Sequence, residues 1–588
     1  MSIFVAALLL AAPAPAIAAP MVAAAVPGSA DARLKALYTD EYAWRRRMLA
    51  SGDANPGGDT RRLPDVGPAA QAEKLARWTR TAAALAAIRP ADLSAAERIN
   101  YLVYRGQIDA LLAEQRFRDY EKPLNSDTSF WGDVADASRG DFVREKDYRD
   151  YIAMLRDMPR YFDQQIANMR AGLARGFTPP QVTLKGRDIG VAQVVEARSP
   201  EESLFYAPFL KMPATIPAAT QSALKAEAAA AIRAAVVPAH AKLLAFLRTD
   251  YIPGARKTIA AYDLPDGRAY YRSKVAEFTT QDQTPEDIHR IGLAEMAAIR
   301  ARMQGVMTEV GFKGDLPAFL AFLRSDPRFY AKTPQDLLDR AAWIAKTFDG
   351  KASQYFGHLP RARFAIKPVP ADLAPFYTSG RGGPGVYLVN TYNLPARPLY
   401  SLAALTLHES APGHAFQMPL AAENSDLPAF RRDGYLSVYG EGWALYCEAL
   451  GEEMGMYDTP YDRFGMLSYQ AWRAARLVVD TGLHAKGWTR EQAQRYLHDN
   501  TALADHEIET EVDRYIAWPG QALSYYTGQL AIQRDRARAE AALGAKFDIR
   551  AFHDAILSLG SVPVSVLDAR TDQLIRDGGK GPYPDEEK

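Results

Sequence analysis

Hydrophobic residues recur at steps of three and four positions along most of the chain. Residues 96–115, AERINYLVYRGQIDALLAEQ, show this period clearly, and their apolar side chains would share one face of a helix. Helix starts are also marked. Thr284 and Thr333 each precede a proline, and Thr489 with Gln492 fits a capping box. The pattern predicts a mainly α-helical fold.

One segment departs from the helical period. Residues 376–395, FYTSGRGGPGVYLVNTYNLP, are rich in glycine and contain the β-branched and aromatic run VYLVNTY. This composition predicts a short strand or a hairpin bounded by turns. An exposed strand edge can hold an extended peptide through main-chain hydrogen bonds, although an ordinary surface hairpin has the same pattern.

The overall composition is that of a globular protein with a sizeable core. The chain has 588 residues, of which 48% are hydrophobic and 24% are charged. Lys plus Arg and Asp plus Glu each number 70, so the net charge is zero. This balance argues against nucleic acid or an anionic membrane as the main partner. We expect residues 31–588 to form one large helical domain, or two lobes that flank a channel; the oligomeric state stays open.

The first 18 residues, MSIFVAALLLAAPAPAIA, predict a secretory signal peptide. The apolar run is too short to span a bilayer, and Ala16-Ile17-Ala18 supplies a small-x-small cleavage site. No Lys or Arg precedes the run, so a leader without fixed structure is the alternative. We expect no later segment to be long and apolar enough for a transmembrane helix. The mature protein is therefore expected to be periplasmic or secreted, without membrane insertion.

The stretch LHESAPGH, residues 407–414, contains two histidines and a glutamate. His408 and His414 are six positions apart, whereas a zinc-binding H-E-x-x-H helix needs four so that both imidazoles share one face. Pro412 and Gly413 interrupt the helix just before His414. A bulge there would bring His414 back beside His408. The alternative is a capped or solvated His-Glu pair without a metal.

A third metal ligand is expected in the helical segment YGEGWALYCEALGEE, residues 439–453. Glu441 and Glu448 are seven positions apart and share a face. We expect Glu441 to bind the metal and Glu448 to orient a ligand or a substrate group, with the reverse assignment as the alternative. Glu409 points to a different side of its helix from His408, which suits a general base rather than a ligand. Two histidines and one carboxylate favour Zn²⁺.

The only cysteine of the chain, Cys447, lies in the same segment. It cannot form an internal disulfide, and an apolar helical environment predicts a buried thiol rather than a nucleophile.

Four motifs in order resemble those of the bacterial family catalogued as domain of unknown function 885: HESAPGHAFQ, EGWALYCE, VVDTGLHAKGWT and RYIAWPGQALSYYTGQ. The resemblance covers most of the mature chain. That family is similar to helical zinc peptidases of the thimet oligopeptidase and angiotensin-converting-enzyme type. The resemblance implies an elongated, helical, zincin-like fold with a deep central channel and a metal in the channel floor. The segment 376–395 adds the expectation of a small sheet near the active site.

The same resemblance implies residues that stabilise the oxyanion of amide hydrolysis. In the similar peptidases a tyrosine and a histidine do so, which points to Tyr525 or Tyr526 and to His484. Packing in the core is the alternative for each. A carboxypeptidase also needs a cation for the terminal carboxylate of its substrate. The candidates near the motifs are Arg397, Arg473, Arg476 and Arg514.

Together these features predict an exported zinc metallopeptidase that hydrolyses short peptides as a carboxypeptidase, dipeptidase or oligopeptidase. A zinc amidase or deacylase for a non-peptide amide would use the same residues. A non-catalytic periplasmic peptide-binding protein is the alternative from another class. Glu409 argues against it, because a binding protein needs no base beside two metal ligands.

Overall fold

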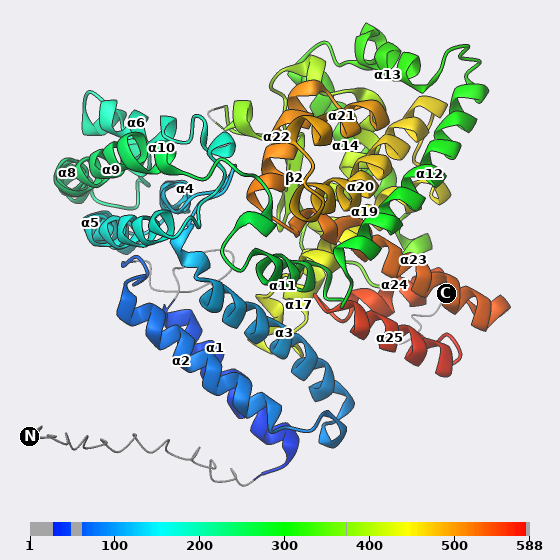
Figure 1. Ribbon diagram of the computed structural model, residues 1–588, viewed down its shortest axis with the longest axis horizontal. Helices are drawn as coiled ribbons and strands as arrows, with labels where there is room; N and C mark the ends of the chain where they lie inside the picture. Colours follow the sequence, from blue (N-terminus) through cyan, green and yellow to red (C-terminus); the bar gives the residue numbers. More distant parts are fainter. Residues whose placement is uncertain (1–27, 49–60, 372, 584–588) are drawn as a thin grey trace, which may run out of the picture.

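The computed structural model describes residues 28–48, 61–371 and 373–583, and most of these residues lie in helices (Figure 1). The mainly α-helical fold is therefore confirmed, whereas the predicted signal peptide, residues 1–18, lies outside the described residues. The helices of the first half are α1 (Ala30–Met48), α2 (Pro68–Ala86), α3 (Ala95–Phe117), α4 (Phe130–Asp136), α5 (Glu145–Ala174), α6 (Ile189–Glu196), α7 (Ala207–Leu210), α8 (Ala218–Ala231), α9 (Val237–Phe246), α10 (Ile252–Gly254), α11 (Gly267–Thr279) and α12 (Pro285–Glu309).

The second half continues in the same way. Its helices are α13 (Leu316–Ser325), α14 (Pro334–Asp349), α15 (Ala352–Tyr355), α16 (Leu402–Glu409), α17 (His414–Glu423), α18 (Ala429–Arg432), α19 (Ser437–Glu453), α20 (Pro460–Ala485), α21 (Arg490–Asn500), α22 (Asp505–Ala517), α23 (Ser524–Leu543), α24 (Ile549–Leu557) and α25 (Val564–Arg576).

The helix starts lie where the sequence predicts them. Thr284 precedes α12, and its side chain accepts a hydrogen bond from the third helical amide. Thr333 before α14 and Thr489 before α21 each form a complete capping box. Such caps satisfy backbone amides that have no partner inside the helix.

The predicted hairpin is part of a small sheet. β2 (Gly380–Gly383) and β3 (Val386–Val389) pair antiparallel, with Gly382 opposite Tyr387. β1 (Ala365–Pro368) adds parallel to the other side of β3, so the order is β1-β3-β2. β2 is therefore an edge strand, and it contacts α16 and α17.

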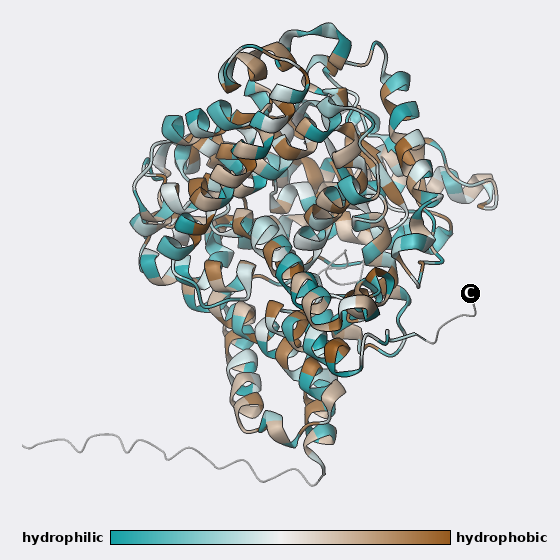
Figure 2. Cartoon of the chain, turned by 90° about the vertical axis from the view of Figure 1, so that its right-hand side faces the viewer, coloured by the Kyte–Doolittle hydropathy of each residue, from teal (hydrophilic) through white to brown (hydrophobic). Residues whose placement is uncertain are grey.

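Three large hydrophobic cores lie among the described residues. One is confined to residues 63–255 and corresponds to the group of α4 to α10 on the left of Figure 1. A second joins α1 to α3 with helices of the C-terminal half, and the third surrounds α20. In Figure 2 hydrophobic and hydrophilic residues alternate along most helices, as expected for helices with one apolar face.

Helix α20 is the central element of the third core. Its residues are buried without interruption from Phe464 to His484, and its main partner is α12. α19 packs closely against α23 because Gly442 and Gly528 face each other. A Cβ at Gly528 would lie 1.9 Å from the carbonyl oxygen of Val438, so only glycine permits this approach. These contacts fix α19 and α20 beside α16.

The expectation that no segment after the leader could form a transmembrane helix is wrong for one segment. Ala218–Gly254 runs through α8, α9, α10 and two π-helical turns, and it is long and apolar enough to span a membrane by length and composition. The most apolar 18 residues of this segment have a mean hydropathy of 1.5, and half of them are buried. The segment packs on α5 and α6. Its many alanines raise the hydropathy, and a buried core helix passes the same test.

Candidate metal centre

The two histidines of LHESAPGH lie on either side of a helix break. α16 ends at Glu409 and α17 begins at His414. The Gly413 amide donates to the carbonyl of Leu407 over 3.0 Å, and a Cβ at Gly413 would lie 1.8 Å from the carbonyl oxygen of His408. Only glycine can close this turn. The interruption that the sequence predicts is therefore a tightly packed turn.

A tryptophan from α19 holds the turn in place. The indole Nε1 of Trp443 donates to the carbonyl of Pro412 over 2.8 Å, and the indole is fully buried. Trp443 lies two residues after Glu441, so one helix both fixes the turn and carries the third candidate ligand.

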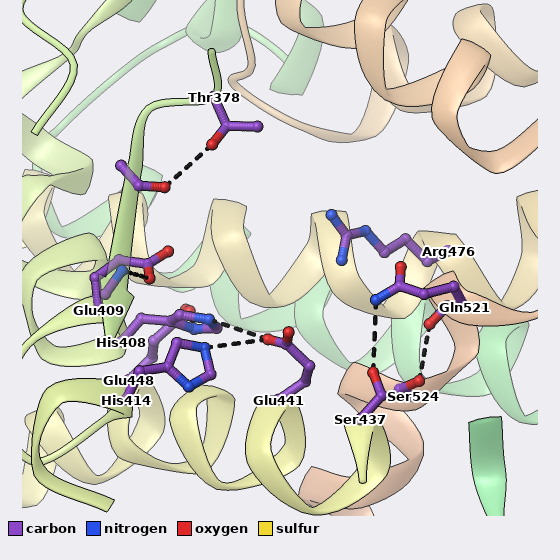
Figure 3. A network of polar contacts seen from close by, with 12 residues as sticks. Thr378, His408, Glu409, His414, Ser437, Glu441, Glu448, Arg476, Gln521 and Ser524 are labelled. Atoms are coloured by element: carbon purple, nitrogen blue, oxygen red, sulfur yellow. Dashed lines mark hydrogen bonds and ion pairs between the residues drawn. The ribbon is translucent and has the colours of Figure 1, made fainter. Parts of the chain in front are cut away.

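The turn places His414 beside His408, with ring centroids 5.0 Å apart (Figure 3). Glu441 Oε2 lies 3.5 Å from His408 Nε2 and 3.3 Å from His414 Nε2. All three potential donor atoms lie within 4.8 Å of one another. Donor atoms around a tetrahedral zinc ion lie about 3.3 Å apart, given bonds of about 2 Å. The arrangement therefore fits a metal ion with three protein ligands.

Glu448 lies behind His408. Its Oε1 is 2.7 Å from His408 Nδ1, and its side chain is completely buried. This contact turns His408 Nε2 toward Glu441 and His414. The geometry favours Glu441 over Glu448 as a ligand, because only Glu441 approaches both histidines.

The electrostatics of the cluster favour a cation. Burial of His408 opposes its protonation, but hydrogen bonds with Glu441 and Glu448 outweigh burial and raise its pKa to about 10. Burial opposes ionisation of Glu441 as well, yet the two histidines hold its pKa well below the ordinary value. The carboxylates thus stabilise positive charge between them, which a metal ion can supply in place of the proton.

Glu409 faces the open space next to the two histidines (Figure 3). Its Oε2 accepts a hydrogen bond of 2.6 Å from the Gly382 amide on the edge strand β2. A Cβ at Gly382 would lie 1.7 Å from the carbonyl oxygen of Glu409, so strand and helix end are in direct contact. The strand fixes the carboxylate of Glu409 while its other oxygen stays available.

The cluster lies on the wall of a cavity of about 2310 Å³. His408, Glu409, His414 and Glu441 all line it. The remaining wall comes from segments far away in the sequence, including α3, α11 and α22. A cavity of this size can admit a short peptide.

Of the two candidate tyrosines, the structure brings only Tyr525 to the cavity. Its ring stacks 6.4 Å from the His408 ring, between centroids. The Tyr526 hydroxyl instead donates to Glu295 Oε2 of α12 over 3.0 Å, and Tyr526 does not line the cavity. The structure therefore corrects the expectation for Tyr526, because adjacent residues of a helix point in different directions.

The structure also corrects the expectation that His484 stabilises the oxyanion. Its Nδ1 accepts from the Ala261 amide over 3.0 Å, and its Nε2 lies 2.9 Å from the carbonyl of Tyr515. Both ring nitrogens are thus used by the backbone, and His484 does not line the cavity. Burial lowers its pKa to about 3. His484 is a core residue that joins α20 to two neighbouring segments.

Sequence reasoning missed Tyr435. This tyrosine, between α18 and α19, lines the cavity, and its ring packs on Gly440, where a Cβ would lie 2.3 Å away. The Tyr435 side chain is 43% exposed, but desolvation of its hydroxyl and the hydrogen-bonded carboxylate of Glu441 raise its pKa well above the ordinary value, so the hydroxyl stays protonated. A loop tyrosine among 30 has no periodic signal that would have identified it.

The four candidate arginines all line the cavity: Arg397, Arg473, Arg476 and Arg514. Arg514 donates to Gln521 Oε1 over 3.0 Å, and Gln521 continues to Ser437 at the start of α19 (Figure 3). Arg514 also forms a hydrogen bond with Tyr525, and its expected role beside the ligands or in substrate binding stays a prediction.

Comparisons with known proteins agree with this fold. The family model described as "Bacterial protein of unknown function (DUF885)" matches residues 49–570. None of the curated proteins matches the sequence. A crystal structure of a proposed lipoprotein from Colwellia psychrerythraea is 28% identical, with a TM-score of 0.86 over 94% of this chain and 100% of that chain.

Two further solved structures are more distant. A proposed lipoprotein of unknown function from Shewanella oneidensis is 18% identical, with a TM-score of 0.64 over 93% of this chain and 98% of that chain. A carboxypeptidase from Pyrococcus furiosus is 12% identical, with a TM-score of 0.27 over 86% of this chain and 98% of that chain. The similarity to the carboxypeptidase is too low to bear on function.

Proposed function

This chain belongs to the DUF885 family, and we propose that it is a metal-dependent hydrolase that cleaves amide bonds of short peptides. The observation that carries the proposal is the convergence of two imidazoles and one carboxylate within 4.8 Å, with Glu409 beside them on a cavity wall. The zincin-like character and the central channel of the fold belong to the same proposal.

The donor set supports Zn²⁺ as the metal, since zinc commonly binds two histidines and a glutamate and keeps a fourth position open. His408, His414 and Glu441 would hold it, and Glu448 would fix the orientation of His408. When bound, zinc supplies a Lewis acid for the substrate carbonyl and lowers the pKa of a water molecule toward neutrality.

Glu409 is the proposed general base. Its carboxylate is fixed by the Gly382 amide, faces the cavity and is not needed as a ligand. It would take the proton of the attacking water and deliver it to the leaving amine. A positioned base of this kind contributes about 10²- to 10⁴-fold to the rate.

Tyr525 and Tyr435 are the proposed donors to the oxyanion. Both line the cavity beside the cluster, and the raised pKa keeps the Tyr435 hydroxyl protonated. A donor that strengthens its hydrogen bond as negative charge develops on the carbonyl oxygen stabilises the transition state, by about 10²- to 10³-fold for one donor.

We also propose that the protein is exported, either to the periplasm or out of the cell. The predicted leader at residues 1–18 supports this, as does the description of two similar solved structures as proposed lipoproteins.

The test combines metal content and turnover. We expect about one equivalent of zinc per chain by elemental mass spectrometry, lost in His414→Ala and retained in Glu409→Gln. Wild type should hydrolyse members of a short-peptide library, and Glu409→Gln should be at least about 100-fold slower.

Two results would overturn the proposal. If wild type takes up no metal after reconstitution with zinc, the cluster is not a metal centre. If the zinc-loaded protein cleaves no peptide of the library, the protein is not a peptidase, and the amidase and peptide-binding alternatives come forward.

A further inference from the structure

Two arginines of α20 stand out because they are deeply buried at a cavity wall. Arg473 is 4% exposed and Arg476 is 1% exposed, and both line the cavity that contains the metal cluster. They are three positions apart and therefore share a face of the helix. Removing a guanidinium from water costs several kcal/mol unless anions and hydrogen bonds compensate it.

The protein compensates these charges only in part. Arg476 donates to Glu511 Oε2 over 2.8 Å and to the Tyr515 hydroxyl over 2.9 Å. The same Glu511 also lies 3.6 Å from Arg514, whose Nε is 3.9 Å from Asp127. The single buried carboxylate of Glu511 is thus shared by Arg476 and Arg514.

The charge of Arg473 has fewer hydrogen-bond partners than that of Arg476. Its guanidinium stacks on the Trp472 ring at 3.5 Å, and its Nε and Nη1 have no hydrogen-bond partner among the described residues. Nη1 of Arg476 also has none there. Glu507, the other nearby carboxyl of α22, accepts a hydrogen bond from Ser379. Burial raises its pKa although the charges of Arg397 and Arg473 act to lower it, so Glu507 is shared by these two arginines and hydrogen bonds to neither. This wall of the cavity therefore carries excess positive charge.

The excess charge lies a short distance from the metal cluster. Arg476 Cζ lies 4.1 Å from the centroid of the Tyr525 ring. The centroid of the His408 ring lies 6.4 Å from the same point. Figure 3 shows the Arg476 guanidinium directed into the open space that Glu409 and Glu441 also face. One aromatic ring thus separates the arginine pair from the cluster.

We propose that Arg473 and Arg476 bind the C-terminal carboxylate of the peptide substrate. A planar guanidinium matches a carboxylate in shape and charge. An extended chain covers about 3.5 Å per residue, and the contacts with the cluster at one end and with a guanidinium at the other add about 3 Å each. One or two residues would therefore bridge the two distances measured from the Tyr525 ring. The inference rests on the proposed function and narrows it to an exopeptidase that releases one or two C-terminal residues.

Binding tests this subsite independently of turnover. Zinc-loaded Glu409→Gln protein is dialysed against a tripeptide library that contains each sequence as a free acid and as a C-terminal amide. Mass spectrometry then counts the retained peptides. We expect about tenfold or greater preference for the acids, the effect of one charge-assisted hydrogen-bonded pair. Adding Arg473→Gln should bring the preference close to one, and Arg473→Lys should restore it in part.

Arg490→Gln is the matched control. Arg490 lines the same cavity but is paired with Asp513 at 2.6 Å and Glu509 at 3.1 Å, so its loss should leave the preference for acids intact. Thermal unfolding of each variant shows whether it is folded. Equal retention of acids and amides by the Glu409→Gln protein, including retention of neither, overturns the subsite.

Turnover by wild type separates this inference from the proposed function. Cleavage of acids and amides at equal rates would retain the hydrolase and refute the carboxylate subsite. Preferential retention of acids with no cleavage by wild type would retain the subsite and refute the peptidase. Cleavage of acids at their last or second-last peptide bond, with little cleavage of amides, supports both.

Discussion

Glu448 acts on the metal cluster through a single contact, the 2.7 Å hydrogen bond to His408 Nδ1. Glu448→Gln would keep an acceptor of similar shape but remove the charge that orients and polarises the imidazole. We expect zinc affinity to fall about 10- to 100-fold. Competition with a chromogenic chelator measures this. Glu452→Gln, an exposed change on the same helix, should leave the affinity unchanged, and equal affinities for all three proteins would contradict the role of Glu448.

His484 should make stability depend on pH. Burial lowers its folded-state pKa to about 3, whereas the unfolded chain binds the proton near 6.5. The unfolded state therefore gains protons as pH falls below 6.5 and the folded state does not, so stability falls in that window. Between pH 6.5 and pH 5 the loss due to His484 is about 2 kcal/mol.

Urea unfolding at several pH values tests this. His484→Asn should lower stability at pH 7, because the variant disrupts the two backbone contacts, but it should flatten the acid-side dependence. His506→Asn, an exposed change on α22, should keep the wild-type dependence. An unaltered slope in His484→Asn would show that His484 is not held neutral in the folded protein.

At the level of elements, the contact of strand β2 with the end of α16 is the most constrained feature. Gly382→Ala would place a Cβ 1.7 Å from the Glu409 carbonyl oxygen and force the strand away from the helix. We expect about 1–3 kcal/mol of destabilisation and a loss of hydrolysis, because Glu409 would lose its amide donor. Gly383→Ala is the matched control, since nothing lies within 4 Å of a Cβ there.

Unfolding midpoints and peptide turnover of the two variants measure the difference. If Gly382→Ala behaved like Gly383→Ala in both assays, the strand would not determine the position of Glu409.

Elements were also the level at which sequence reasoning worked best. The capping residues Thr284, Thr333 and Thr489 act locally, so their pattern alone predicts where helices begin. The break before His414 was predictable for the same reason, because proline and glycine act on the adjacent backbone. The expectation that no later segment is long and apolar enough to span a membrane was wrong for Ala218–Gly254, whose many alanines raise its mean hydropathy.

At the scale of the whole molecule, the proposed metal joins helices from different parts of the chain, because α16, α17 and α19 each supply one ligand. A ligand that binds only the folded state stabilises it by about 2.7 kcal/mol at 100 times its dissociation constant. We therefore expect zinc to raise the melting temperature of the chelator-treated protein by a few degrees, as differential scanning calorimetry can measure. His414→Ala should show no such response, and an equal rise in that variant would mean that zinc acts elsewhere.

The cavity is a property of the whole molecule as well. Its wall joins α3 near the N-terminus with α22 near the C-terminus, and the helices that connect them belong to three separate hydrophobic cores. No local sequence pattern predicts that α3 and α22 line the same cavity. The proposed carboxylate subsite depends on it, because Glu511 on α22 and Arg476 on α20 must lie side by side.

The sequence by itself determined the helical class, the hairpin, the helix starts and the residues with metal-binding chemistry, since each follows from side chains within a few positions. Only the tertiary structure decided which tyrosine, histidine and arginine side chains face the cavity. The physical reason is that α20 is buried on all sides from Phe464 to His484, so its hydrophobic period does not distinguish the face of Arg473 from that of His484. Tyr525 and Tyr526 are likewise both buried, and the packing of α23 against α12 and α19 alone separates their roles.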